Sequence, residues 1–328
     1  MIWSRVSTML LALTLDLLVG DPPNSIHPSA WMGRLIAYAM RFRPQSQASI
    51  EMAYGAGITL GGSVLVAGIG GALGKWLTKL HGDRPGNLVT YLIEAAILKS
   101  TFSLRGLNKA VKEVQVALER GDLPAACRFL SWHLVSRDTS TLDGSLISSA
   151  AIESVAENTS DGILAPLIYY ILGGLPMALM YRFVNTADSM LGYHTPELEW
   201  LGKVPARLDD LFNYLPARLT TATIVLSAPF AGGNVYRTWG VMRRDARKTR
   251  SPNAGCPMSA MAGALGVELE KVDHYRLGTG GRKPGIGDIR RARSVMFTAT
   301  AMVTGLVLLL RLWLSPPCSV EGNGGNKK

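Results

Sequence analysis

The chain has 328 residues, of which 48% are hydrophobic, and it carries a formal net charge of +10. A soluble protein of this length would be expected to form two domains, but apolar residues gathered in long blocks favour a membrane protein instead. The three cysteines, Cys127, Cys256 and Cys318, show no paired spacing. They therefore imply neither a disulfide framework nor a zinc site.

Six apolar blocks are candidates for membrane segments, and a span needs roughly 20 apolar residues. The blocks at 52–73 and 294–314 are long enough. The block at 162–181 is interrupted by Gly-Gly-Leu-Pro, which predicts a hairpin or a kinked span. The block at 219–230 is too short and is expected to extend a helix that begins outside the bilayer. The six blocks are 6–19, 52–73, 88–104, 162–181, 219–230 and 294–314.

These blocks predict an all-α, polytopic integral membrane protein with helical cytoplasmic segments. We find no repeats and no linker, so the prediction is a single domain over 1–328. The tail at 315–328 is rich in Pro, Gly and Asn and is expected to be disordered. The glycines between 55 and 74 follow no strand, so they predict close helix packing rather than a nucleotide-binding loop.

The first block follows Arg5 and superficially resembles a signal peptide. Asp16 interrupts it and no small-residue cleavage site follows, so we interpret it as a retained anchor. A carboxylate inside an apolar helix is costly and usually functional. Asp21 precedes two prolines that end the helix, and His27 lies in the following turn. We take Asp21 and His27 as candidate binding residues, although a histidine beside a proline is more often structural.

The excess positive charge lies in the loops between blocks. The positive-inside rule places the loops 21–51, 105–161 and 232–293 in the cytoplasm. These basic clusters lack interleaved aromatic residues, so no nucleic-acid partner is expected. Their charge could also do no more than set the topology.

An extramembrane helical layer is predicted between 104 and 161. Amphipathic helices are expected over 104–120 and 123–134, the second with a proline in its first turn. The stretch that follows, RDTSTLDGSLISSAAIESVAENTSD, begins with Arg137 and Asp138, both candidate binding residues. Asp138 and Asp143 also suit helix capping.

Three acids share one face of the helix predicted over 146–161. Glu153, Glu157 and Asp161 follow one another at intervals of four residues, on the same face as apolar Leu146 and Ala150. A solvated helix would place its acids opposite its apolar residues. This face is therefore expected to meet a metal, phosphate or cation, and the three acids are candidate catalytic residues and magnesium ligands. The alternative is an irregular amphipathic helix.

A second polar cluster spans 181–218. Asn185 and Asp188 directly follow an apolar block, and Arg207, Asp209 and Asn213 begin the next helix. Polar groups at the ends of membrane segments are expected to converge with the acids of 153–161 at the bilayer surface. Asp188, Arg207 and Asp209 are candidate catalytic residues, and the two asparagines are candidate binding residues.

A basic segment at 235–257 places five arginines and one lysine around Asp245, before a rigid turn at 251–255. This pattern suits phosphate or carboxylate binding, with Arg247, Ser251 and Asn253 as candidates. The alternative is a juxtamembrane loop that binds anionic lipid.

Several long motifs resemble the CobD/CbiB family, the adenosylcobinamide-phosphate synthases of cobalamin biosynthesis. They appear in family order over most of residues 10–295. One departure is Cys256, where an aromatic residue would be expected. The motifs are DLLVGDPPNSIHP, LRGL, RDTSTLD, AAIESVAENTSDGILAPLIYY, YRFVNTADSMLGY, ARLDDLFNYLPARLT, DARKTRSPNAGCPMSAMAGALGVEL, YRLG and DIRRA.

The resemblance implies a multi-pass inner-membrane enzyme that uses ATP and magnesium. Its activity would join aminopropanol, usually phosphorylated, to a propionate carboxylate of adenosylcobyric acid, with Asn158 of the AENTSD motif among the binding residues. Activation of a carboxylate requires ATP, a metal held by acids and basic groups near the developing charge, and the clusters above could supply them. No P-loop is present.

The expected partners are the corrinoid, the amine and membrane lipids, with a homo-oligomer or a complex with other cobalamin-assembly membrane proteins as further options. Two rival functions remain. One is a transporter, which should show internal repeats that we do not find. The other is a non-enzymatic signalling relative.

Overall fold

The computed structural model describes residues 2–25, 27–45, 47–81, 88–193 and 195–313, so the predicted disordered tail lies outside the described residues. The described chain is almost entirely helical, which confirms the all-α class. The helices are α1 (Ile2–Val19), α2 (Pro28–Met40), α3 (Ala48–His81), α4 (Leu88–Lys99), α5 (Leu104–Glu119), α6 (Leu123–His133), α7 (Gly144–Asn158), η1 (Thr159–Leu164), α8 (Ala165–Gly173), α9 (Leu175–Leu191), α10 (Lys203–Ser227), η2 (Ala228–Ala231), α11 (Val235–Asp245), η3 (Ala246–Lys248), α12 (Gly255–Leu265) and α13 (Ile286–Trp313).

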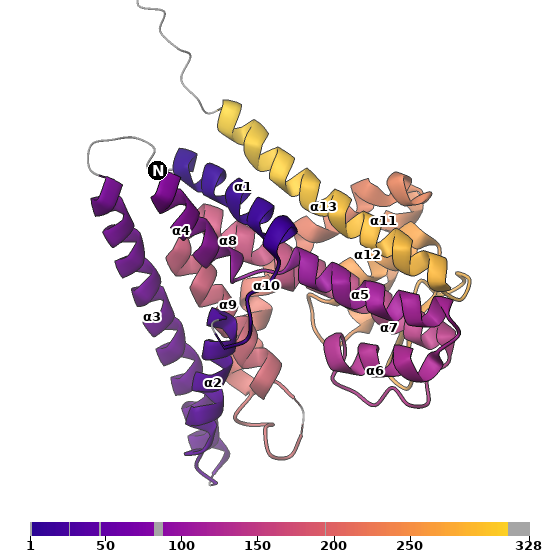
Figure 1. Ribbon diagram of the computed structural model, residues 1–328. Helices are drawn as coiled ribbons and strands as arrows, with labels where there is room; N and C mark the ends of the chain where they lie inside the picture. Colours follow the sequence, from indigo (N-terminus) through magenta and orange to yellow (C-terminus); the bar gives the residue numbers. More distant parts are fainter. Residues whose placement is uncertain (1, 26, 46, 82–87, 194, 314–328) are drawn as a thin grey trace, which may run out of the picture.

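Two of the described helices, α3 and α13, are long and apolar enough to cross a membrane, at Ala48–Leu80 and Ile286–Trp313. They contain the two blocks predicted to be long enough, up to the last described residue. The carboxyl-terminal half of α13 runs beside α1 (Figure 1), where Arg311 lies 3.4 Å from Ser7, and it exposes Leu306, Leu309 and Leu310. The other four blocks form shorter or interrupted helices. For example, α1 has 18 residues and α4 has 12.

The predicted break in the block at 162–181 is confirmed. Gly174 has φ of 71°, a conformation that favours glycine, and it separates α8 from α9. Arg5 donates from its Nη1 to the carbonyl oxygens of Ile171 and Leu172, both at 3.0 Å, which satisfies the carboxyl end of α8. The block at 219–230 is the end of α10 and η2, as predicted.

The central acidic helix begins at Gly144, where the Asp143 Oδ1 accepts the Leu146 N–H at 2.8 Å. It is α-helical to Asn158 and then widens into one π-helical segment, η1. Because α8 follows without a break, one continuous rod runs over 144–173. The expected regular spacing of four residues therefore fails beyond Asn158, since a π-turn contains more residues than an α-turn.

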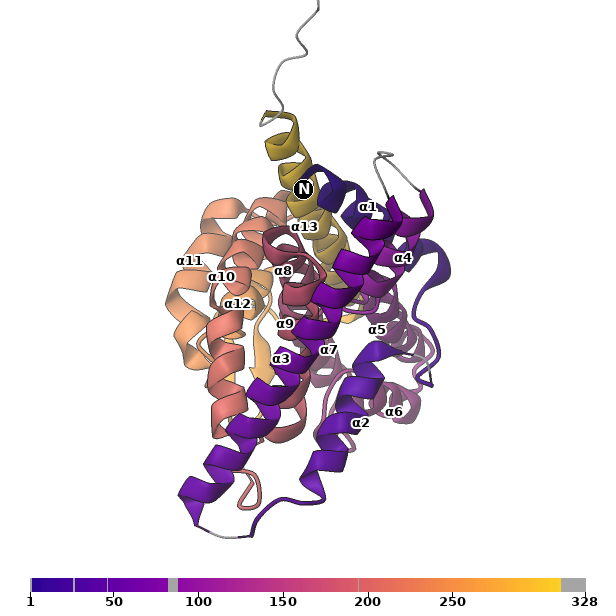
Figure 2. The ribbon, with the colours of Figure 1, turned by 90° about the vertical axis from the view of Figure 1, so that its left-hand side faces the viewer.

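Helix α3 packs along α9, as Figure 2 shows. Gly62 faces the Phe183 ring and Gly55 faces the Leu201 carbonyl, so a side chain at either glycine would collide with its neighbour. This confirms the predicted helix-packing role of these glycines. Besides this contact between α3 and α9, a large hydrophobic core joins α1, α5, α7, α8, α12 and α13.

A β-hairpin that the sequence analysis did not predict lies after α12. Its strands β1 (Leu269–Lys271) and β2 (Tyr275–Leu277) are antiparallel, with Leu269 opposite Leu277. Asp273 adopts φ of 61° in the turn. Strand β1 packs against α7, which places the hairpin beside the acidic helix.

Candidate active site

A polar cavity of about 490 Å³ lies where η1 meets α9, α10 and the segment 250–254. We call it the acidic cleft, because five carboxylates line it. It brings together most of the site residues predicted from three separate parts of the sequence. The predicted residues that line it are Glu157, Asn158, Asp161, Asn185, Asp188, Asp209, Asn213, Ser251 and Asn253, and Asp210 is the fifth carboxylate.

Asp161 lies on the π-helical segment, where the irregular backbone is held by side chains. The Thr159 hydroxyl donates to the Val155 carbonyl at 2.6 Å, and the Tyr181 hydroxyl lies 3.0 Å from the Asp161 carbonyl. Burial, then repulsion from Asp209 and Glu157, raise the pKa of Asp161 well above its usual range. The cleft therefore brings together acids that repel one another and that retain their protons to a higher pH than exposed acids do.

Asp209 is held by two amides. The Asn185 Nδ2 donates to its Oδ1 at 3.2 Å, and the Asn213 Nδ2 donates to its Oδ2 at 2.9 Å. Burial raises the pKa of Asp209 to about 6, and these two hydrogen bonds oppose the rise. Both amides come from the cluster predicted over 181–218. The two asparagine side chains fix the Asp209 carboxylate in one orientation near the amino-terminal end of α10.

The segment after the basic loop is fastened to α10. The Asn253 Nδ2 donates to the Asp210 carbonyl at 2.6 Å, and the Ser251 Oγ lies 3.4 Å from the Asp210 Oδ1. Arg218 donates to the Asn253 side-chain oxygen and, at 3.1 Å, to the Pro252 carbonyl. Its guanidinium also lies 3.9 Å from the centre of the Tyr214 ring. Sequence reasoning missed Arg218, because its partners lie 34 and 35 residues away.

Glu153 does not line the acidic cleft. It is buried, and its carboxylate accepts from Tyr275 at 3.2 Å and from Ser149 at 3.3 Å. Ser149 in turn accepts the Glu270 N–H at 2.7 Å, so Glu153 anchors the hairpin on α7. Burial raises the pKa of Glu153 to about 7, against the field of Arg137. The three acids predicted to share one helix face therefore separate. Glu153 faces the hairpin, and Glu157 and Asp161 face the acidic cleft.

Asp21 and His27 lie in a different place, which we call the N-terminal ion-pair cluster. Lys99 is buried there, with its Nζ 3.3 Å from the Asp16 Oδ1 and in contact with Asp21. His27 caps α2, since its Nδ1 accepts the Ser29 N–H at 3.2 Å. Burial raises the pKa of Asp21, but hydrogen bonds from His27, Lys99 and Ser103 outweigh it and hold the pKa well below its usual range.

Arg182 connects the two regions and was not predicted. Its Nε lies 3.3 Å from the Ser29 Oγ, and its Nη1 lies 3.4 Å from the Asn185 Oδ1. Asn185 belongs to the acidic cleft, and Ser29 lies beside His27. A polar path therefore runs from the end of α1 to Asp209.

The remaining predicted residues lie outside the acidic cleft. Asp138 accepts from the Ser140 N–H and hydroxyl, and Arg137 lies near Glu153. Arg207 and Arg247 are exposed, although the charge of Arg207 acts on Asp210.

Within the described part of the chain, no three His, Cys, Asp or Glu side chains form a ready-made metal centre. The predicted magnesium set fails as a unit because Glu153 faces the hairpin. The oxygen donors of the cleft nevertheless suit magnesium, which usually takes one or two protein carboxylates together with waters and substrate phosphates. Glu157, Asp161 and Asp209 are the candidates.

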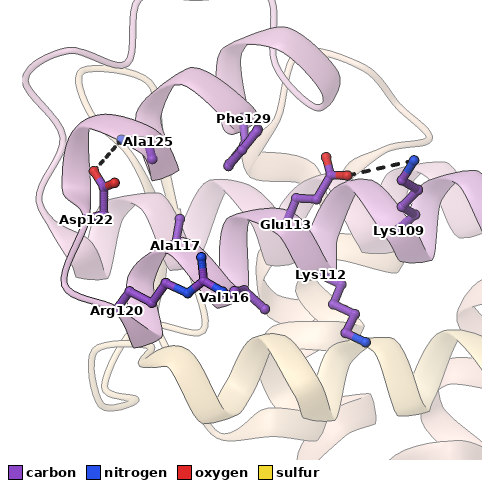
Figure 3. A pocket seen from close by; sticks show the side chains of 9 residues that line it. All are labelled: Lys109, Lys112, Glu113, Val116, Ala117, Arg120, Asp122, Ala125 and Phe129. Carbon is purple, nitrogen blue, oxygen red and sulfur yellow. Dashed lines mark hydrogen bonds and ion pairs between the residues drawn. The ribbon is translucent and has the colours of Figure 1, made fainter.

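A separate groove of about 540 Å³ lies between α5 and α6 (Figure 3). Val116, Ala117 and Phe129 give it an apolar floor, and Lys109 at its rim pairs with Glu113 at 4.0 Å. None of its lining residues belongs to the acidic cleft. The groove therefore lies apart from the candidate active site.

These features define a helical protein with two helices of membrane-spanning length and a carboxylate-rich cleft at the junction of several helices. The model of the CobD/Cbib protein family matches residues 9–304, so the chain belongs to this family. No solved structure matches the chain.

Several curated relatives are similar over nearly their whole length. "Cobalamin biosynthesis protein CobD" of Dehalococcoides mccartyi is 42% identical over 82% of this chain and 85% of its own. The protein of the same name from Klebsiella pneumoniae is 36% identical, and "Cobalamin biosynthesis protein CbiB" of Salmonella typhimurium is 35% identical. Both alignments cover 93% of this chain and 97% of the relative.

Proposed function

We propose that this protein acts in cobalamin biosynthesis as a membrane-bound, ATP-dependent ligase that attaches aminopropanol, or its phosphate, to a propionate carboxylate of adenosylcobyric acid. The names of the relatives support the pathway. The observation that carries the ligase chemistry is the acidic cleft bordered by Arg250 and the segment 251–254. It combines carboxylates for a metal and an ammonium group with the Arg250 cation for an anion.

A carboxylate does not react with an amine at neutral pH and must first be activated. In the proposed reaction the propionate oxygen takes the terminal phosphoryl group of ATP and ADP leaves. The amine, after losing a proton, then attacks the acyl carbon and inorganic phosphate departs with the oxygen. The reaction consumes one ATP for each amide bond.

Magnesium bound with the nucleotide would supply positive charge to the phosphates, and Glu157, Asp161 and Asp209 would hold it. The chain's own residues do the rest. Asn185 and Asn213 fix the orientation of the Asp209 carboxylate, and the remaining negative charge of the cleft attracts the ammonium form of the amine.

The segment 251–255 would cover the activated carboxylate and exclude water. Arg218 supports this role, because it holds both Pro252 and Asn253 against α10. The arginines of α11 and η3 would collect anionic substrates at the entrance.

The proposed location is the inner membrane, with several passes and with the loops 21–51, 105–161 and 232–293 in the cytoplasm. The two long apolar helices support it. A carbonate wash should leave the protein with the membranes, and release without detergent would contradict this location.

Product formation tests the function directly. Protein purified in neutral detergent should release ADP only when corrinoid, amine and magnesium are all present, in equal amount to the amide formed. ADP release that ignores the corrinoid, or amide formation without ATP, would refute the ligase. Failure to form any amide would favour the transporter or signalling alternatives.

A further inference from the structure

A second cavity, of about 250 Å³, adjoins the acidic cleft. We call it the basic pocket. Glu157, Arg250, Ser251 and Ala254 line both cavities and form the wall between them. The other residues that line the basic pocket are Lys248, Thr249, Met258, Lys271, His274 and Tyr275. Its far side is therefore built by the β-hairpin, a segment to which the proposed function gives no role.

Two of its cations have no carboxylate partner among the ion pairs of the described chain. Lys271 is half-buried at the end of β1, and its Nζ lies 6.0 Å from the centre of the Tyr275 ring. On the opposite side, Arg250 has no ion pair with any described residue. Lys248 differs, because its Nζ lies 2.7 Å from the Asp245 Oδ1. Half-buried Lys271 and exposed Arg250 line the pocket together, and Glu157 is the carboxylate of the pocket on which the charge of Lys271 acts. Two cations beside one carboxylate leave room for an anionic ligand.

The hairpin that carries Lys271 is fixed on both of its sides. Tyr275 donates to buried Glu153, and the Glu270 N–H donates to Ser149, which ties the hairpin to α7. On the other side Lys248 donates to the Arg276 carbonyl at 3.4 Å and to the Thr279 hydroxyl at 3.2 Å. Lys271 is therefore held at the pocket before any ligand arrives.

A further cavity adjoins the basic pocket on the side of the hairpin. A wider groove of about 510 Å³ runs along the hairpin, and Lys248, Lys271, His274 and Tyr275 line it as well as the basic pocket. Thr279, Glu270 and Asp273 add oxygen atoms to this groove. A ligand with a compact anionic part and a larger polar part would fit the two spaces together.

We propose that the basic pocket binds the phosphate chain of a nucleoside triphosphate, with Lys271 and Arg250 as its main cationic contacts. The nucleoside lies along the hairpin, and the terminal phosphate reaches the shared wall at Glu157 and Ser251. The amine and the corrinoid carboxylate then approach from the acidic cleft. This inference rests on the proposed function and adds to it the nucleotide subsite.

The test is equilibrium binding of ATP, with magnesium, to the full-length protein in neutral detergent. Lys271→Ala should weaken ATP binding about tenfold or more, because a charge-assisted contact is lost. Arg250→Ala, at an exposed position, should weaken it similarly. The matched control is Lys112→Ala, at a lysine that lines the separate groove in Figure 3, and its affinity should stay unchanged. Inorganic tripolyphosphate should displace ATP from the wild type and compete less well in Lys271→Ala.

The same variants separate the two possible sources of phosphate. If Lys271→Ala and Arg250→Ala bind ATP like the wild type but lose affinity for aminopropanol phosphate, the pocket serves the amine and the inference is wrong. Unchanged ATP binding in both variants, with a wild type that binds ATP, refutes this subsite and leaves the proposed function standing. A wild type that binds no ATP refutes both. Partial rescue of ATP binding by Lys271→Arg would support a charge contact over a folding defect.

Discussion

The acidic cleft and the N-terminal ion-pair cluster both gather partly or fully buried carboxylates, but they differ in the groups placed beside them. In the N-terminal cluster, Lys99 lies beside both Asp16 and Asp21; burial raises the pKa of Asp16, whereas hydrogen bonds lower the pKa of Asp21. In the cleft, the pKa values of Asp161 and Asp209 are raised by burial, and acids face acids. A carboxylate whose partner is built into the chain stabilises the fold, whereas one that lacks a partner is available to a ligand.

The largest expected effect is on catalysis at Asp209. Asp209→Asn keeps the size of the side chain but removes the charge that Asn185 and Asn213 orient. We expect turnover to fall about a thousandfold, with little change in thermal unfolding. The measurement is amide formation by chromatography, with Asp122→Asn, at a helix cap outside the cleft, as the control. Normal turnover would place the reaction elsewhere.

The N-terminal ion-pair cluster should respond in stability. Lys99→Met removes the cation beside Asp21 and the fully buried Asp16, and leaves Asp16 with the Arg105 N–H as its remaining hydrogen-bond donor among the described residues. We expect a loss of about 3 kcal/mol in the free energy of unfolding. Denaturant unfolding in detergent would measure it, and Lys109→Ala, which breaks an exposed pair with Glu113, should change stability by less than about 0.5 kcal/mol. Equal effects in the two variants would contradict the comparison.

Glu153 lies between these cases, because its charge is buried but bonded only to hydroxyl groups in the described chain. Its pKa rises from 4.5 to about 7, so the folded protein binds this proton more tightly than the unfolded chain. That stabilisation is complete below the unfolded value and is lost as pH rises through 7.

Glu153→Gln stays neutral and should remove this dependence. We expect the variant to be more stable than the wild type by about 3 kcal/mol near pH ~8, and this difference should disappear below pH ~4. Thermal unfolding over this pH range is the measurement. Parallel curves for the two proteins would show that Glu153 does not titrate in this range.

The smallest effect is expected at Arg218, which positions the cleft wall without lining it. Arg218→Lys keeps the charge but cannot bond to both Asn253 and Pro252 in the same geometry. Amide formation should fall about tenfold, with some ATP hydrolysed without product because water reaches the activated carboxylate. If Arg218→Lys still releases one ADP for each amide formed, the segment 251–255 does not shield the reaction from water.

Local chemistry explains what the sequence could predict. Asp143 caps its helix as predicted, whereas Asp138, also predicted to cap, bonds to Ser140 instead. Gly174 breaks the apolar block where glycine and proline were expected to. The convergence of Asn185 and Asp209 with Asp161 was predicted from their places beside apolar blocks, whereas the position of Ser251 in the same cleft was not predicted.

Tertiary contacts account for what the sequence could not predict. Lys99 reads as an ordinary basic residue until Asp16 and Asp21 are seen on either side of it. The hairpin strands have three residues each and depend on Ser149 and Glu153 of α7, more than 100 positions earlier. The wide turn at η1 leaves no mark in a pattern that assumes 3.6 residues per turn.

The π-helical turn divides the continuous rod over 144–173 into two parts with different contacts. Before it, Ser149 and Glu153 hold the hairpin. At its end and just after it, Ile163, Leu164 and Leu167 are buried in the hydrophobic core. In a uniform α-helix, Asp161 would continue the face of Glu153 and Glu157, and the apolar side chains after it would point in other directions than they do here. The π-helical turn instead places Asp161 at the acidic cleft while the rod on both sides of it stays buried. Removal of one residue there would restore α-helical spacing, and Asp161 and the apolar side chains after it could not all keep their present neighbours.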